Sequence, residues 1–543
     1  MQSTMMNVPL SLNHLLERAG TLFAANTVVS RLPDKSLRTH TYGDIYRRTR
    51  ALASALQALG LNKGDRVATL CWNHHAHLEC YFGIPAAGGV MHTLNLRLAA
   101  DEIGWIAGDA QDRFLIVDDI LLPLYRQFAA AHAFERVIVV PFSGAAVPPE
   151  PAGFIDYEAL LADADPDGFE YAAHHEDDPV AMCYTSGTTG RPKGVAYSHR
   201  STVLHTLVGC LPDYWGLCST DVVLPVTPMF HANCWGVPYG AVMMGVKLVF
   251  PGPHLHPDDL LDLIQLEPPT LALGVPTIWM GLIQRYDQAL SLEPGRWKLP
   301  HGMRSLVGGA AVPEALIRAF AKHGVWLLQG WGMTETSPLA TVSYLRNELK
   351  DGGDEERFRR AAMAGVPVPL VDVRIRTEDG ADAPWDGATM GEIQVRGPFI
   401  TGSYHQVPVT DDKFTHDGWL RTGDVATMDA LGFVRITDRT KDLIKSGGEW
   451  ISSVDLENAL MAHPAVAEAA VIAIADEKWS ERPLACVVLR PGQSATPEQF
   501  KAHLHQHGFA KWQLPDRYEF IDAVPRTSTG KFWKMKLRER FAK

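Results

Sequence analysis

Residues 247–284 read KLVFPGPHLHPDDLLDLIQLEPPTLALGVPTIWMGLIQ, and in them short β-branched runs alternate with segments in which apolar residues recur at helical spacing. The same alternation continues to residue 329. Strands separated in this way by single helices predict a largely parallel sheet with helices on both faces. The predicted strands are Lys247–Phe250, Thr270–Leu273, Ser305–Val307 and Val325–Gln329, and the predicted helices are Pro257–Glu267, Thr277–Gln284 and Pro313–His323.

The sequence changes in character beyond residue 365. Short strands such as Gly391–Val395 and Gly432–Ile436 are separated by Gly and Pro, which predicts a small β-rich subdomain over about residues 365–437. The charged run from Asp438 to Asp442 then interrupts the apolar pattern, and residues 438–543 contain their own helix and strands. We therefore expect an α/β protein with a large domain of doubly wound, mostly parallel sheets at 1–437 and a small α+β domain at 438–543. In the small domain the predicted helix is Ser453–Met461 and the predicted strands are Val466–Ile474 and Leu484–Leu489.

The composition excludes several classes of protein. A chain of 543 residues suggests two to four domains. No apolar run approaches the roughly 18 residues that cross a bilayer, and residues 1–10 show no secretory signal, so we expect a cytoplasmic protein without a transmembrane segment. The seven cysteines include no Cys-x-x-Cys pair, which argues against a zinc site or a disulfide framework. A net charge of −12 argues against a general nucleic-acid binder.

A loop rich in glycine and hydroxyl groups, Tyr184-Thr-Ser-Gly-Thr-Thr-Gly-Arg-Pro-Lys-Gly194, follows the predicted strand Val180–Cys183. Its glycines let backbone N–H groups turn inward, and Lys193 adds positive charge, so the loop is suited to bind a phosphate. It lacks the spacing of a Walker A loop, and a glycine-rich loop alone is often only a flexible turn. The side chains and glycine that would contact the phosphate are Thr185, Ser186, Gly187, Thr188, Thr189 and Lys193.

This loop resembles the phosphate loop of the adenylate-forming superfamily, which includes acyl-CoA synthetases, firefly luciferases and the adenylation domains of peptide synthetases. Other family-like strings follow in the family's order, and the resemblance extends from Tyr42 to Lys531. It is closest to the medium- and long-chain fatty acid:CoA ligases. The strings are Gln329-Gly-Trp-Gly-Met-Thr-Glu-Thr336, Trp419-Leu-Arg-Thr-Gly-Asp424, Asp438-Arg-Thr-Lys-Asp-Leu443 and Pro525-Arg-Thr-Ser-Thr-Gly-Lys531.

The resemblance implies roles for particular residues in binding ATP. Trp331 would stack on adenine, Thr334 would meet the α-phosphate, and Glu335 with Thr185 would hold Mg²⁺, an ion that prefers one or two carboxylates. Asp424 and Arg439 would bind the ribose hydroxyls. Gly309, Ala310, Gly330, Gly332 and Met333 complete the implied ATP site, with Lys531 and the phosphate loop.

The small domain would supply the remaining chemistry. Lys531 resembles the family's catalytic lysine, and Glu335 and Thr185 are the other implied catalytic residues. Asp438 resembles the hinge about which the mobile domain turns between the two half-reactions, because one pocket must serve two partners. The segment implied to meet coenzyme A is Ser446, Gly447, Gly448, Glu449 and Trp450.

We place the acyl pocket at His231, Asn233, Trp235, Gly308 and Gly332. The glycines would leave room for the chain near the carboxyl edge of the sheet. Trp235 resembles the aromatic residue that gates the fatty-acid tunnel of long-chain synthetases. Alternatively, Trp235 is the fixed wall of a shallow pocket for a short acid.

The resemblance implies an ATP-dependent carboxylic acid:CoA ligase that forms an acyl-adenylate and then a thioester, releasing pyrophosphate and AMP. The expected substrate is a medium- or long-chain fatty acid, and the expected assembly is a homodimer, as in relatives. Ligases for short thioether acids such as 3-methylthiopropionate share much of the pattern. A luciferase-like oxygenase, a peptide-synthetase-like unit and a non-catalytic nucleotide-binding protein are the alternatives of other classes.

Overall fold

The computed structural model describes all residues of 1–543 except 2, 149–152, 186–190, 448, 528–530 and 542–543. At its centre is a sheet of nine strands in the order β16-β15-β14-β13-β12-β10-β11-β1-β2. The six strands from β14 to β1 are parallel, and antiparallel strands complete both edges. The bounds are β1 Thr27–Arg31, β2 Leu37–Thr41, β10 Val222–Pro225, β11 Lys247–Phe250, β12 Leu271–Gly274, β13 Arg304–Val307, β14 Trp326–Gly332, β15 Leu339–Val342 and β16 Val366–Pro367.

The helices of this layer confirm the predicted alternation, because α9, α10 and α11 each connect two parallel strands. The amphipathic pattern of α10 continues beyond the predicted Gln284, so the helix is longer than expected. Their apolar sides pack with the sheet in one buried cluster that includes Leu260, Trp279 and Phe320. The bounds are α8 Val237–Met244, α9 Pro257–Leu266, α10 Pro276–Leu292, α11 Glu314–Ala321 and α12 Gly353–Ala361.

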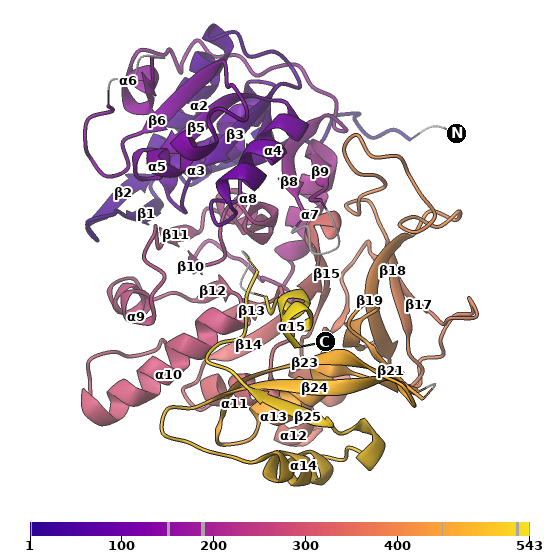
Figure 1. The fold of residues 1–543 in the computed structure, drawn as a ribbon. Helices are drawn as coiled ribbons and strands as arrows, with labels where there is room; N and C mark the ends of the chain where they lie inside the picture. Colours follow the sequence, from indigo (N-terminus) through magenta and orange to yellow (C-terminus); the bar gives the residue numbers. More distant parts are fainter. Residues whose placement is uncertain (2, 149–152, 186–190, 448, 528–530, 542–543) are drawn as a thin grey trace.

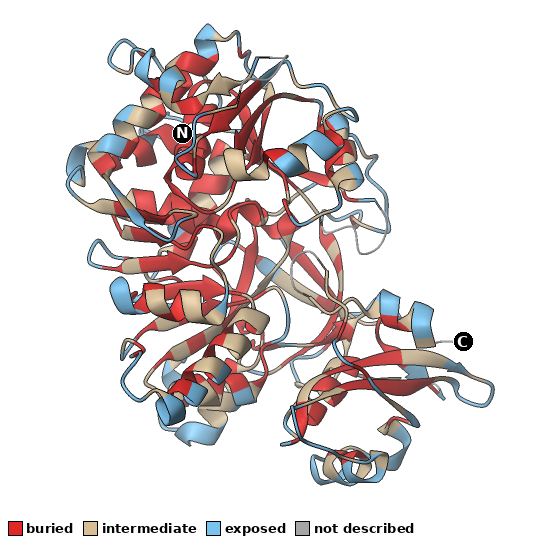
Figure 2. Ribbon diagram, turned by 60° about the vertical axis from the view of Figure 1, so that its left-hand side comes forward, coloured by how far each residue is buried: buried red, intermediate tan, exposed pale blue. Residues whose placement is uncertain are grey.

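A second sheet of seven strands, in the order β7-β6-β5-β3-β4-β8-β9, occupies one end of the molecule (Figure 1). One apolar cluster contains residues of both sheets, for example Phe114 and Leu248, together with Ile84 of α3, so the two sheets share a core (Figure 2). The strands are β3 Arg66–Leu70, β4 Val90–Thr93, β5 Asp112–Asp118, β6 Arg136–Val140, β7 Ile155–Asp156, β8 Pro179–Tyr184 and β9 Gly194–Ser198; the helices are α1 Leu12–Leu22, α2 Tyr42–Ala58, α3 His75–Ala86, α4 Ala100–Ala110, α5 Leu122–Phe128, α6 Tyr157–Ala162 and α7 His199–Gly209.

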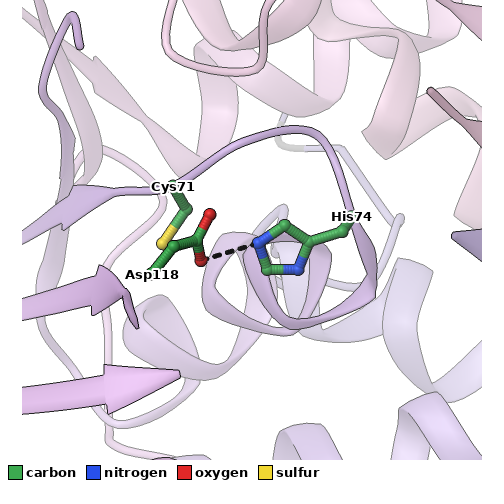
Figure 3. Close-up of side chains that lie close together, drawn as sticks. All are labelled: Cys71, His74 and Asp118. Carbon is green, nitrogen blue, oxygen red and sulfur yellow. Dashed lines mark hydrogen bonds and ion pairs between the residues drawn. The ribbon is translucent and has the colours of Figure 1, made fainter. Parts of the chain in front are cut away.

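A buried cluster of Cys71, His74 and Asp118 fixes the start of α3 (Figure 3). Their potential ligand atoms lie within 4.8 Å of one another, but each already has a partner in the protein. His74 Nδ1 accepts the Ala76 N–H, so its Nε2–H donates to Asp118 Oδ1 at 2.8 Å. Asp118 Oδ2 accepts the Trp72 N–H, and the Cys71 thiol donates to a backbone carbonyl of β5. These contacts account for the cluster as a helix N-cap tied to the neighbouring strand.

The predicted β-rich subdomain is a four-stranded antiparallel sheet. Its strands are β17 Asp372–Arg376, β18 Gly391–Arg396, β19 Leu420–Met428 and β20 Val434–Arg439. The last strand contains Asp438, so the chain leaves this sheet only after Arg439. Asp438 is therefore the penultimate residue of a strand rather than part of a free linker.

The small domain has its own sheet and two apolar clusters, and it lies at the opposite end of the molecule from the seven-stranded sheet (Figure 1). Helix α13 covers the predicted residues, which confirms that prediction. Together the two large sheets, the β-rich sheet and this domain confirm the predicted fold class. The bounds are β21 Ile444–Ser446, β22 Glu449–Ile451, β23 Val466–Asp476, β24 Ser480–Leu489, β25 Arg517–Phe520, α13 Ser453–Met461, α14 Pro497–Gln506 and α15 Lys534–Phe541.

Short 3-10 helices occur at η1 Asp119–Leu121, η2 Ala232–Gly236, η3 Thr334–Thr336, η4 Asn347–Leu349 and η5 Lys511–Gln513. Within the described part of the chain, every helix is too short or too polar to span a bilayer.

Candidate active site

Two adjoining cavities, of about 650 and 340 Å³, lie where β13 and β14 end and where the small domain meets the large one. They bring together most of the residues that the sequence analysis selected, from segments far apart in the chain. The larger cavity is lined by Thr185, Lys193, His231, Trp235, Gly308, Gly309, Gly330, Trp331, Gly332, Met333, Thr334, Glu335, Arg439 and Lys531. The smaller is lined by Gly309, Ala310, Gly330, Trp331, Gly332, Asp424, Asp438, Arg439 and Lys531, among others.

The phosphate loop is closed at its base by paired hydrogen bonds. The Thr185 hydroxyl accepts the Lys193 N–H at 3.0 Å, and the Thr185 N–H donates to the Lys193 carbonyl at 3.0 Å. The Lys193 ammonium lies 4.9 Å from the centroid of the Tyr404 ring, a cation–π contact. Ser186, Gly187, Thr188 and Thr189 lie outside the described residues.

Glu335, in η3, is a carboxylate that is only 6% exposed. Its Oε1 accepts a hydrogen bond from the Tyr404 hydroxyl at 2.7 Å. Its charge and that of the Lys531 ammonium attract each other, since Glu335 acts to raise the pKa of Lys531. A buried carboxylate that lines the same cavity as Thr185 supplies the kind of oxygen ligand that Mg²⁺ prefers. Tyr404 could not be selected from the sequence, because it lies 69 residues from Glu335 along the chain.

Asp424 and Trp331 form the other end of the site. Asp424 on β19 is paired in register with Arg439 on β20, and Arg439 Nε lies 3.2 Å from Asp424 Oδ1. The Trp331 indole N–H donates to Asp424 Oδ2 at 2.9 Å. Gly332 follows Trp331 at a bulge, where an added Cβ would lie only 1.6 Å from the Pro338 carbonyl oxygen. Glycine is therefore required there for the backbone of β14 to pass.

Lys531 reaches both cavities from the small domain. Burial lowers the pKa of its ammonium to about 8, and repulsion from Arg439 acts in the same direction. Asp424 and Glu335 oppose this shift because they attract the charged form. The ammonium is thus held in the field of the two carboxylates that the sequence analysis assigned to ribose and metal.

Asp438 is 2% exposed and connects strand β20 to helix α13. Its Oδ1 accepts the Arg439 N–H at 2.8 Å, and its Oδ2 accepts the Ser453 N–H of α13 at 2.7 Å. Nearby, Lys534 Nζ pairs with Glu457 Oε1 at 2.7 Å, and both side chains are almost fully buried. Burial raises the pKa of Asp438, and it raises the pKa of Glu457 to about 7.

Of the segment assigned to coenzyme A, the described residues Ser446, Gly447, Glu449 and Trp450 line neither cavity in this arrangement of the domains. The Ser446 hydroxyl accepts a hydrogen bond from Arg482 at 2.9 Å, and the Gly447 N–H donates to the Trp479 carbonyl at 2.8 Å. Glu449 is exposed, Trp450 is partly exposed, and Gly448 lies outside the described residues.

The wall of the larger cavity contains five consecutive residues with φ between +42° and +77°, Ala232 to Gly236. Four of them carry a Cβ, and the left-handed region costs about 1–2 kcal/mol for each such residue. The Cys234 thiol, which donates to the Thr227 carbonyl at 3.0 Å, helps to hold this left-handed turn in place. Trp235, at the cavity, is 7% exposed, and its ring lies 3.5 Å from where a Cβ of Gly308 would be.

The left-handed turn separates residues that the sequence places together. His231 lines the cavity, and burial lowers its pKa to about 3, with repulsion from Lys531 and Arg97 adding to the effect. Asn233 does not line either cavity, because its positive φ turns the side chain toward β8, where its amide oxygen accepts the Cys183 thiol at 3.2 Å. Asn233 is therefore behind the wall and not on its surface.

Comparison with known proteins decides the family. Residues 16–405 match the model of the AMP-binding enzyme, and residues 455–531 match that of the AMP-binding enzyme C-terminal domain. The chain belongs to the AMP-binding enzyme family. Family members of this type are AMP-forming acid–CoA ligases, and the catalytic class of this chain is acyl-CoA ligase.

Relatives that match over their full length are ligases for different acids. A long-chain-fatty-acid–CoA ligase of Thermus thermophilus is 48% identical over 541 residues, which is 99% of this chain and 97% of that one. A 3-methylmercaptopropionyl-CoA ligase of Ruegeria lacuscaerulensis is 42% identical, and the match covers 100% of this chain and 99% of that one. A medium-chain-fatty-acid–CoA ligase of Ectopseudomonas oleovorans is 39% identical, and the match covers 100% of this chain and 98% of that one.

Solved structures show the same fold for the whole chain. The anthranilate CoA ligase AuaEII, in complex with anthranoyl-AMP, matches with a TM-score of 0.85 at 25% identity and 99% coverage of both chains. ATP-bound MatB from Rhodopseudomonas palustris matches with a TM-score of 0.81 at 27% identity, with 98% of this chain and 99% of that chain covered. The substrates of this family member are thus a carboxylic acid, ATP and coenzyme A.

Proposed function

We propose that this acyl-CoA ligase activates a medium- or long-chain fatty acid, and that the cavity residues act as the sequence analysis assigns them. The observation that carries the proposal is the composition of the larger cavity around Trp235. The apolar side chains that line this cavity include Trp215, Trp235, Leu306, Pro338 and Leu339. Such a surface suits a hydrocarbon tail, each buried methylene of which contributes about 0.8 kcal/mol.

In the first half-reaction the acid's carboxylate attacks the α-phosphorus of ATP, and pyrophosphate leaves. Lys531 would lie between the two anionic reactants, where its ammonium lowers their repulsion in a partly dehydrated site. Glu335 and the Thr185 hydroxyl would hold Mg²⁺, which supplies charge neutralisation at the phosphate oxygens. Trp331 and Asp424 would fix the adenosine, so the α-phosphate is presented at a constant position.

In the second half-reaction the coenzyme A thiolate attacks the acyl carbon, and AMP leaves. Lys531 lies at the cavity, and the described residues of the segment at 446–450 do not line it. This arrangement is the one that adenylation needs, which supports the proposal that thioester formation requires a rotation about Asp438. The rotation would bring the Ser446–Trp450 segment to the cavity, where Gly447, at φ +63°, permits a close approach to the thiol arm.

A second candidate substrate is a short thioether acid such as 3-methylthiopropionate. The 42% identity to the Ruegeria ligase favours it, and so does the position of the Trp235 ring, which lies close enough to Gly308 to touch an added Cβ and would make a shallow pocket if Trp235 does not move. The two candidates differ in what Trp235 does: it is a movable gate for a long acid and a fixed wall for a short one.

Pyrophosphate release with acids from propionate to palmitate, including 3-methylthiopropionate, tests the choice. If Trp235 is a gate, the wild-type enzyme should use acids of roughly ten or more carbons, with kcat/KM rising with each buried methylene. The dependence of kcat/KM on chain length should then be the same in Trp235→Ala. For a fixed wall, the wild type should be restricted to short acids, and Trp235→Ala should accept longer ones, each methylene adding up to about fourfold in kcat/KM. The second result would replace the fatty acid by the thioether acid.

A further inference from the structure

Trp331 presents two different surfaces to the nucleotide end of the site. Its ring lines both cavities, and its N–H edge donates to Asp424 Oδ2 at 2.9 Å. A phenylalanine or tyrosine at this position could offer a ring face to adenine but could not place an N–H donor at the same edge. The residue type is therefore informative beyond the need for an aromatic ring.

The Asp424 carboxylate is held from two sides. Arg439 Nε forms an ion pair with Oδ1 at 3.2 Å, and the indole N–H donates a hydrogen bond to Oδ2, so each oxygen has one side-chain partner among the described residues. A carboxylate accepts about four hydrogen bonds, which leaves acceptor positions on both oxygens for two ribose hydroxyls. Because both donors are on strands that also carry the site, β14 and β20, the plane of the carboxylate is fixed before the nucleotide arrives.

We infer that Trp331 is a positioning residue for sugar recognition: its indole N–H orients Asp424 toward the ribose hydroxyls, so that one side chain couples base stacking to discrimination between ribose and deoxyribose. This inference rests on the proposed roles of Trp331 and Asp424. It goes further than them, because it assigns the ability to select a ribonucleotide to an edge of the ring that does not face the base.

The test compares kcat/KM for ATP with kcat/KM for 2′-deoxy-ATP and 3′-deoxy-ATP in the pyrophosphate-release assay. Weaker stacking changes all three values alike and cancels in their ratios, whereas misplacing Asp424 lowers only the preference for the ribose hydroxyls. A hydroxyl hydrogen bond to a carboxylate is worth on the order of tenfold to a hundredfold. We expect Trp331→Phe to reduce the ratio for at least one deoxynucleotide by about threefold to tenfold, since Asp424 stays present but less constrained.

A double-mutant cycle separates this inference from the proposed function. Asp424→Asn should itself reduce the ratios, and Trp331→Phe in the Asp424→Asn background should reduce them no further. Unchanged ratios in Asp424→Asn would show that Asp424 does not read the ribose, and the inference would fall with that role. Reduced ratios in Asp424→Asn but unchanged ratios in Trp331→Phe would overturn the inference alone.

A second variant guards against a folding defect in Trp331→Phe. Benzothienylalanine introduced at Trp331 keeps the bicyclic ring and replaces only the N–H by sulfur. It should reproduce the loss of ribose preference while leaving the thermal midpoint of the protein unchanged. Full ribose preference in this variant would overturn the inference, because nothing but the proposed donor has been removed.

Discussion

The buried pair of Lys534 and Glu457 offers a stability prediction that can be worked out from the structure. The two charges are 2.7 Å apart inside the small domain, and the side chains are 10% and 8% exposed. Lys534→Met removes the only cation that pairs directly with Glu457 among the described residues. The Asp438 and Asp442 carboxylates also face Lys534, but Asp442 keeps Arg538, and Asp438 keeps its two backbone donors.

The size of the effect depends on pH because Glu457 can be neutralised by a proton. Its pKa is about 7 in the folded protein and 4.5 in the reference state, so its contribution to stability is present below 4.5 and is lost as the pH rises through 7. Without Lys534 the folded pKa rises further, and each unit between 7 and the solution pH costs the variant about 1.36 kcal/mol more than the wild type. The excess is close to zero at pH 6.0 and about 2.7 kcal/mol at pH 9.0, below the 3–5 kcal/mol expected for an unpaired buried charge.

Urea unfolding at pH 6.0 and 9.0, followed by hydrogen-exchange labelling of the peptides over α13, measures the small domain by itself. The matched control is Glu457→Gln, which has no titrating group, and in that background Lys534→Met should show no pH-dependent loss. An equal loss of stability at both pH values, or a pH-dependent loss that persists in the double variant, would refute the reasoning.

Four further predictions concern the reaction. Lys531→Ala should reduce the rate of acyl-adenylate formation by about 10² or more and spare thioester formation from supplied acyl-adenylate. Equal losses in both steps would contradict the role of Lys531. In the wild-type enzyme, kcat/KM for adenylation should fall as the pH rises through about 8, where Lys531 loses its proton. Asp438→Pro should retain pyrophosphate exchange and lose thioester output, since proline fixes φ; normal rates of both would place the hinge elsewhere. Tyr404→Phe removes the hydroxyl that bonds Glu335 and should raise the Mg²⁺ concentration for half-maximal pyrophosphate exchange by about threefold to tenfold; an unchanged Mg²⁺ titration would exclude Tyr404 from orienting that carboxylate.

The sequence was a good guide wherever local chemistry determines local structure. The alternation over residues 247–329 predicted four strands of the central sheet, and the apolar spacing of α13 predicted its bounds. Most of the residues selected from sequence motifs line the two cavities. They meet there because the ends of neighbouring parallel strands lie at the same edge of the sheet.

The features that the sequence did not reveal depend on contacts between distant residues. Tyr404 meets Glu335 and Trp331 meets Asp424 across 69 and 93 residues of chain, and no spacing rule links them. The left-handed turn was not predictable for another reason. Asn is often found at a single positive φ, but Ala, Cys and Trp are not, so a run of four such residues is imposed by the surrounding core. Asn233 was expected at the acyl pocket because it lies between His231 and Trp235 in the sequence, but the turn directs its side chain away from the cavity.

The left-handed turn makes this wall of the larger cavity, where we propose that the acid binds, a property of the main chain. Substituting glycine for Asn233 or Cys234 should make the turn less costly to form, since glycine accepts positive φ without a Cβ penalty, although neither side chain contributes to the surface that an acid would meet. The hydrogen bonds from the Cys183 and Cys234 thiols, which hold the turn, can thus change while the residues that line the cavity stay the same. Two related ligases with identical lining residues would then differ in acid preference if the backbone beneath Trp235 is held more firmly in one than in the other.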